Sequence, residues 1–127
     1  MLLEKRLMAH ILIIDDEKHI RAFYEESLIE SGYKVSLAGS AEEALDYMTS
    51  VKFDLAILDI KLGDTNGLDL LQQINRQFKD LPVILCSAYD SFREDQKAAA
   101  AIKYVVKSFD LSELKRTVSG VLDKRTS

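Results

Sequence analysis

The sequence has one cysteine, Cys86, one proline, Pro82, and no tryptophan. A single cysteine cannot form an internal disulfide, so we expect the protein in the reducing cytoplasm. No apolar run approaches the roughly 20 residues that cross a bilayer, and the N-terminus lacks a signal-peptide pattern, so we expect no membrane contact. The net charge of −4 argues against direct nucleic-acid binding, because phosphate backbones are bound by basic surfaces.

The length and the apolar content fit a single folded domain. The chain has 127 residues, of which 47% are hydrophobic and 30% are charged, enough for one sizeable core. We expect an N-terminal leader over residues 1–8 that is flexible and has no assigned role. The domain itself is expected over residues 9–122, followed by a C-terminal tail over residues 123–127.

Short apolar blocks alternate with amphipathic segments along this domain. The blocks predict strands over residues 9–14, 34–37, 55–58, 82–86 and 104–106. Helical spacing predicts helices that begin at Lys18, after Ser40, at Gly67 and after Asp110, and a short, weakly anchored helix over residues 92–100. Regular alternation of strand and helix indicates an α/β domain, in which helices cover both faces of a parallel sheet.

Polar residues follow four of the predicted strands: Asp15 and Asp16, Asp59, Ser87, and Lys107. Parallel strands point their carboxyl ends to the same edge of a sheet, so these side chains should converge. Three carboxylates at one edge repel one another unless a cation is present, and Mg²⁺ prefers such oxygen ligands. The pattern predicts a magnesium site beside a carboxylate that can act as a nucleophile toward phosphorus.

Each of these residues also has an ordinary interpretation when it is considered alone. An acid after a strand often caps the next helix, a serine often ends a buried run, and a lysine often extends into solvent. The convergence of all of them at one edge favours the functional interpretation. In that interpretation, Ser87 donates to one phosphoryl oxygen and Lys107 neutralises another.

With these residues in place, the chain resembles the receiver domain of two-component response regulators, the CheY-like superfamily, from about His10 to Leu122. The matching residues are Asp15-Asp16, Asp59, Gly67 at the start of the next helix, Ser87-Ala88, and Tyr104 three residues before Lys107. The resemblance implies a single doubly wound (βα)5, flavodoxin-like domain. Its five-stranded parallel sheet would have the order 2-1-3-4-5.

The resemblance also implies a phosphoacceptor switch that depends on Mg²⁺. Asp59 would accept a phosphoryl group from a histidine kinase or a histidine phosphotransfer protein. Asp16 and Asp59 would ligate Mg²⁺ directly, Asp15 would do so through water, and Lys61 would contribute its backbone carbonyl. The chain would be no enzyme beyond assisting its own phosphorylation and dephosphorylation.

The resemblance further implies a switch in the residues beyond the acceptor. Ser87 would move toward the phosphoryl group and Tyr104 would turn inward. The movement would reshape the face of the fourth helix, fifth strand and fifth helix, which a downstream protein or an output domain would recognise.

The sequence departs from the family pattern near the predicted site. Ser108 follows Lys107 where the family usually has a proline with a cis peptide bond, which costs about 2.5–4 kcal/mol for other residues. Gly63 stands where a proline is common, so we expect a looser loop after Asp59. The segment 98–101 is four alanines, without the glycine often found before the fifth strand.

Three other functions remain open at this point. A receiver-like interaction module would work without phosphorylation. A metal-dependent phosphatase with an aspartyl nucleophile would need a second acid two residues after Asp59, where this chain has Lys61. A nucleotide-binding domain would need a glycine-rich first loop, where this chain has Asp15-Asp16-Glu17.

Overall fold

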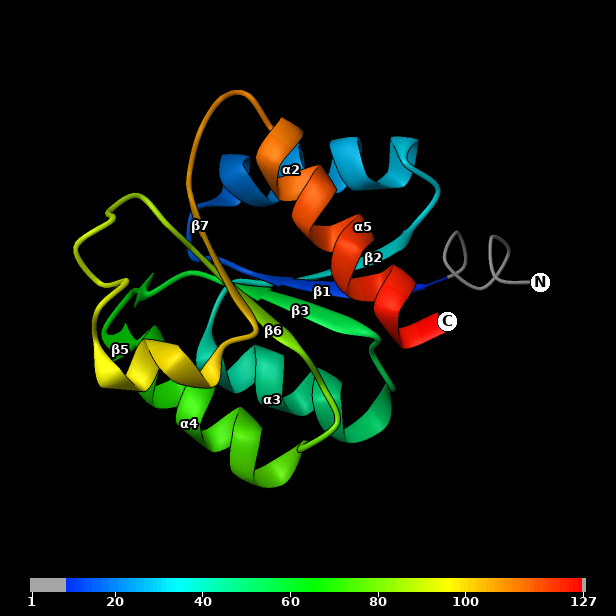
Figure 1. The fold of residues 1–127 in the computed structure, drawn as a ribbon. Coiled ribbons are helices and arrows are strands. Elements are labelled where there is room, and N and C mark those ends of the chain that lie inside the picture. Colours follow the sequence, from blue (N-terminus) through cyan, green and yellow to red (C-terminus); the bar gives the residue numbers. More distant parts are fainter. Residues whose placement is uncertain (1–8, 127) are drawn as a thin grey trace.

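The computed structural model describes residues 9–126. Its main sheet is parallel and five-stranded, with the order β2-β1-β3-β6-β7 (Figure 1). The strands are β1 (His10–Ile14), β2 (Lys34–Ala38), β3 (Leu55–Leu58), β6 (Val83–Ser87) and β7 (Lys103–Val106). The order 2-1-3-4-5 of the predicted strands is therefore confirmed, and so is the fold class.

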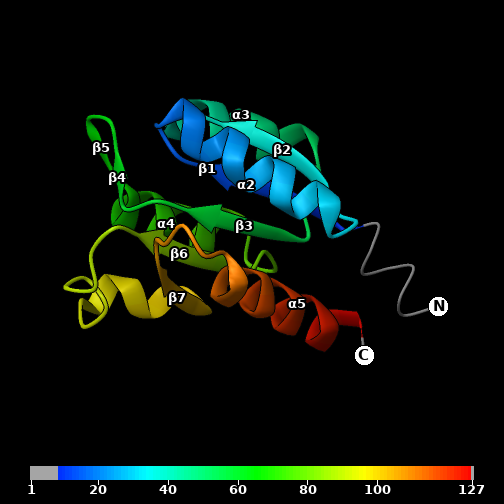
Figure 2. The same ribbon diagram turned by 90° about the horizontal axis from the view of Figure 1, so that it is seen from above.

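Helices cover both faces of this sheet. Figures 1 and 2 show α2 (Lys18–Glu30) and α5 (Ser112–Thr126) on one face, and α3 (Ala41–Ser50) and α4 (Gly67–Gln77) on the other. Side chains alternate between two cores along each central strand: Ile11 and Ile13 pack toward α2 and α5, whereas Leu12 and Ile14 pack toward α3 and α4. Because both faces are covered, the interiors of the central strands are apolar, and polar residues stand only at their ends, as His10 and Ser87 do.

Local sequence signals set several of the helix boundaries. Ser40 Oγ accepts a hydrogen bond from the amide of Glu43 at 3.1 Å, as expected of a helix cap, while Glu43 Oε1 accepts one from the amide of Gly39. Gly32 follows α2 with φ of 96°, a left-handed conformation that ends helices. No described helix is long and apolar enough to span a membrane.

The segment after Asp59 differs from the loose loop that we expected. It forms a small antiparallel hairpin of β4 (Lys61–Leu62) and β5 (Thr65–Asn66), with Gly63 at its turn. Asn66 then caps α4 by accepting a hydrogen bond from the amide of Leu68 at 2.8 Å. Two residues per strand are too few to give a periodic signal in the sequence.

The predicted weak helix over residues 92–100 is shorter in the structure. Only Gln96–Ala100 is helical, as a 3₁₀ helix, η1, in which Ala98 is the one buried residue. Such a segment has too little apolar surface to hold a full helix against the sheet.

The bond between Lys107 and Ser108 is trans, since residues 9–126 contain no cis peptide bond. The predicted leader lies outside the described residues, and α5 continues to Thr126.

Gly67 packs against the strand that carries Asp59. A Cβ atom at this position would lie 2.1 Å from the backbone oxygen of Asp59 and 2.7 Å from Cα of Ile60. Contacts this short with backbone atoms cannot be relieved by side-chain movement, so only glycine allows α4 to start here.

We expect Gly67→Ala to lower the free energy of unfolding by about 3 kcal/mol, because the backbone of Asp59 and Ile60 must move away from the start of α4 to admit the methyl group. Chemical denaturation would measure the loss. Gly120→Ala is the matched control, since a Cβ there meets nothing within 4 Å and alanine favours a helix interior by up to about 1 kcal/mol. Equal stabilities of the two variants would contradict this account of the packing.

Candidate functional site

The polar residues that follow the strands lie together at the carboxyl edge of the sheet. Their backbones continue the sheet ladder: the amide of Asp59 donates to the carbonyl of Ile14 at 2.9 Å, and the amide of Lys107 donates to that of Ser87 at 2.7 Å. The amide of Asp15 donates to the carbonyl of Ala38 at 3.1 Å. Strand register therefore places these side chains at a common edge, as the sequence predicted.

One ammonium group links the two buried acids of this edge. Lys107 Nζ lies 2.8 Å from Asp15 Oδ2 and 3.0 Å from Asp59 Oδ2. The relative exposure of Asp15 is 2%, that of Asp59 is 6%, and the side chain of Lys107 is 13% exposed. Glu17 Oε1 is farther away, at 3.9 Å, and its side chain is half exposed. Removing one partner would leave a buried charge unpaired, which is costly.

Burial and the neighbouring opposite charges shift the pKa values of Asp59 and Lys107 in opposite directions. Burial raises the pKa of Asp59 and the Asp15 carboxylate adds to the rise, whereas Lys107 and the backbone amide of Lys61 lower this pKa; burial is the largest effect, and the net shift is upward. Burial lowers the pKa of Lys107, but its hydrogen bonds to Asp15 and Asp59 outweigh burial and the net shift is upward. Lys107 is therefore a cation at neutral pH, and it favours the ionised form of Asp59.

A cluster of oxygen ligands lies beside this ion pair. Carboxylate oxygens of Asp15, Asp16 and Glu17 lie within 4.8 Å of one another, a spacing that could hold a metal ion. Asp16 and Glu17 are exposed and open to a pocket that also contains Asp59 and Lys61. Carboxylates in this arrangement fit Mg²⁺, which takes one or two of them together with waters and a phosphoryl oxygen.

The pocket has a volume of about 350 Å³. Of the predicted site residues, it brings together Asp16, Asp59, Lys61, Ser87 and Lys107, while Asp15 is buried behind it. Its wall also contains Glu17, Ala88 and Tyr89. The pocket therefore offers a nucleophilic carboxylate, a cation and a hydroxyl within one small space.

Tyr104 lies outside this pocket but is linked to it through the backbone. Ser87, 1% exposed, accepts a hydrogen bond from the amide of Tyr89 on its Oγ at 3.1 Å. The Tyr104 hydroxyl in turn donates to the carbonyl of Tyr89. The guanidinium of Arg93 lies over the Tyr104 ring, 4.8 Å from its centroid. Hydrogen bonds through the backbone of Tyr89 therefore connect Ser87 to Tyr104.

Glu17 lines the site, although the sequence analysis assigned it no ligand role. Two contacts at the site were missed. Tyr89 lies under the ammonium of Lys61, which is 4.4 Å from the ring centroid, and no motif indicated this contact. The amide of Gly63 donates to Asp16 Oδ2 at 2.9 Å. A backbone donor has no signature in a pattern of side chains.

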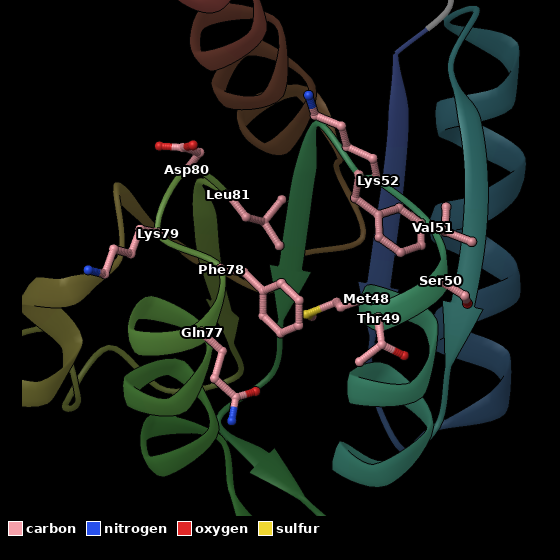
Figure 3. A pocket seen from close by; sticks show the side chains of 11 residues that line it. Met48, Thr49, Ser50, Val51, Lys52, Gln77, Phe78, Lys79, Asp80 and Leu81 are labelled. Atoms are coloured by element: carbon pink, nitrogen blue, oxygen red, sulfur yellow. The ribbon is translucent and has the colours of Figure 1, made fainter.

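A larger cleft, about 490 Å³, lies between the C-terminal ends of α3 and α4 (Figure 3). Its lining combines apolar side chains, among them Met48, Phe78 and Leu81, with polar groups such as Gln77. It contains none of the residues that the sequence singled out. The predicted site residues Asp16, Asp59, Lys61, Ser87 and Lys107 all line the smaller pocket.

Comparisons with known proteins identify the family to which this fold belongs. The family model of the response regulator receiver domain matches residues 11–119. The structure is similar to the crystal structure of the response regulator TrrA from Thermotoga maritima in complex with Mg(2+)-BeF, with 42% identity and a TM-score of 0.87, over 90% of this chain and 99% of that chain. TrrA in a complex with the histidine kinase ThkA is similar too, with 43% identity and a TM-score of 0.85, over 91% and 99% of the two chains.

Curated relatives are longer than this chain. The DNA-binding transcriptional regulator NtrC of Azospirillum brasilense is 35% identical over 93% of this chain, which covers 25% of that protein. The response regulator MprA of Mycolicibacterium vanbaalenii is 34% identical over 91% of this chain, which covers 51% of that protein. The chain thus spans between a quarter and about half of these two relatives. It belongs to the response regulator receiver domain family.

Proposed function

We propose that this receiver domain is a phosphoacceptor switch in which Asp59 accepts a phosphoryl group from the phosphohistidine of a histidine kinase or a histidine phosphotransfer protein. The observation that carries the proposal is the pairing of the buried Asp59 carboxylate with Lys107 at 3.0 Å, at the wall of an acid-lined pocket. The domain would be a signalling switch rather than an enzyme.

The transfer exchanges one bond to phosphorus for another. A carboxylate oxygen of Asp59 attacks the phosphorus atom, and the bond from phosphorus to the donor's histidine nitrogen breaks. The electron pair of that bond stays on the nitrogen. Lys107 would neutralise one phosphoryl oxygen and Ser87 would donate a hydrogen bond to another. In the same site, water would later cleave the acyl phosphate and regenerate the Asp59 carboxylate.

The acid residues would hold Mg²⁺ for this reaction. Asp16 and Asp59 would bind it directly, Asp15 through water, and Lys61 through its backbone carbonyl. The ion would supply positive charge next to the phosphoryl oxygens. The protein's own part is to keep Asp59 ionised, oriented and shielded from bulk solvent.

The signal would leave the site through the hydrogen bonds that join Ser87, Tyr89 and Tyr104. A phosphoryl group that attracts Ser87 would change the support of Tyr104 and so reshape the surface of η1, β7 and α5. A downstream protein or an output domain would read that surface. In NtrC and MprA, the matched region is only part of a longer protein.

We expect the wild-type protein, incubated with Mg²⁺ and acetyl phosphate, to gain the mass of one phosphoryl group in an acid-stable and base-labile form. Asp59→Asn should gain none, because the amide is a poor nucleophile. Asp64→Asn is the matched control, since Asp64 is exposed in the nearby hairpin, and it should gain the mass as wild type does. Intact-mass spectrometry measures the adduct.

Two results would contradict the proposed function. A wild-type protein without the adduct would favour an interaction module that works without phosphorylation. Many turnovers of acetyl phosphate without an accumulated adduct would favour a phosphatase.

We expect Asp16→Ala to weaken Mg²⁺ binding by about 10-fold or more and Glu17→Ala by less than about 3-fold. Both residues belong to the acidic cluster, but only Asp16 is assigned as a direct ligand. Isothermal titration calorimetry of the unphosphorylated protein would compare them. Equal losses in the two variants would show that the ligand assignment is wrong.

A further inference from the structure

The hairpin between Asp59 and α4 is fixed at its base. Lys61 pairs with Asn66 and Leu62 pairs with Thr65, and the amide of Gly67 donates to the carbonyl of Ile60 at 2.6 Å. The backbone amide of Lys61 also bonds to the Asp59 carboxylate. The turn of the hairpin therefore has a defined position relative to the acceptor.

Gly63, at that turn, reaches the first acidic loop. Its amide donates to Asp16 Oδ2 at 2.9 Å, a contact between residues 47 positions apart in the sequence. Gly63 has φ of +60°, a conformation that favours glycine, while a Cβ atom here would meet nothing within 4 Å. Glycine is therefore favoured here by the positive φ and not by a lack of space for a side chain. In this conformation the Gly63 amide points toward Asp16.

We propose that the Gly63 amide is a positioning group for the magnesium site, which fixes the orientation of Asp16 through Oδ2 and leaves Oδ1 to the ion. This inference rests on the proposed function, in which Asp16 is a direct ligand. An exposed carboxylate otherwise samples several rotamers, and ordering it costs conformational entropy when the ion binds. Hydrogen bonds to metal ligands are worth about 10- to 100-fold in metal affinity.

The hydrogen bond from the Gly63 amide to Asp16 gives a reason for glycine, rather than proline, at position 63. A proline would remove the amide hydrogen and fix φ near about −65°, so it can neither donate to Asp16 nor adopt the observed turn. Gly63 supplies both the donor and the backbone conformation. With this donor, the hairpin links the two carboxylates that the proposed function assigns as direct ligands, Asp59 through Lys61 and Asp16 through Gly63.

Two substitutions at Gly63 distinguish the effect of losing the amide hydrogen from the effect of adding a side chain. Gly63→Pro should weaken Mg²⁺ binding by about 10-fold or more, because the amide hydrogen is lost. Gly63→Asn keeps the hydrogen and tolerates a positive φ better than most residues, so its affinity should stay within about 3-fold of wild type. Calorimetry with Mg²⁺ alone measures both, and chemical denaturation confirms that both variants are folded.

A second measurement leaves the hairpin sequence intact. In metal-free protein, Asp16→Ala should speed hydrogen exchange at the Gly63 amide by about 10-fold, because the acceptor is gone. Exchange at the amide of Asp59, which donates to Ile14, should stay unchanged. This readout does not depend on phosphorylation or on metal.

The outcomes distinguish the inference from the proposed function. Wild-type Mg²⁺ affinity in Gly63→Pro, equal losses in the proline and asparagine variants, or unchanged Gly63 exchange in Asp16→Ala would each overturn the inference. The phosphoacceptor function would survive those results if wild type still forms the adduct on Asp59. A wild type without the adduct would instead overturn the function, whatever Gly63 does.

Discussion

The structure of the site depends on one ammonium group placed between two buried carboxylates. Lys107 follows β7, and its side chain reaches past the end of β6 to Asp59 and Asp15, which follow β3 and β1. The small Ser87 ends the intervening strand. Without the lysine, two acids would share a poorly solvated edge and the pKa of Asp59 would rise further. With it, Asp59 can remain ionised although it is almost fully buried, and an ionised carboxylate is the form that attacks phosphorus.

Much of this arrangement could be predicted from the sequence, because strand ends and buried runs are marked by residue type. The run of Leu55 to Leu58 ending at Asp59 specifies both a buried strand and the position of its acid, and the main-sheet order follows from the same pattern through the family resemblance. The hairpin could not be predicted, because its strands are two residues long and its contact with Asp16 is made by a backbone amide. The length of η1 could not be predicted either, because its alanines favour a helix but offer little apolar surface to pack against the sheet.

The departures from the family pattern have different consequences. Ser108 leaves a trans bond after Lys107, and the ammonium still reaches both acids. Gly63 lies at the turn of an antiparallel hairpin, in the segment where we expected a looser loop. The acceptor, the acidic loop and the hairpin therefore form one connected unit, joined by Lys107 on one side and by backbone amides on the other. Tyr104 lies at the border of this unit, joined to Ser87 through hydrogen bonds of Tyr89.

The most direct test of this account is a pH titration of the Asp59 carboxyl carbon by ¹³C NMR, in wild type and in Lys107→Met, without metal. If Lys107 holds Asp59 ionised, its removal should raise the Asp59 pKa by about one unit or more, as loss of a close opposite charge does. Lys107→Arg, which keeps the cation, should leave the pKa closer to that of wild type. An Asp59 pKa that is the same in Lys107→Met and in wild type would contradict the account.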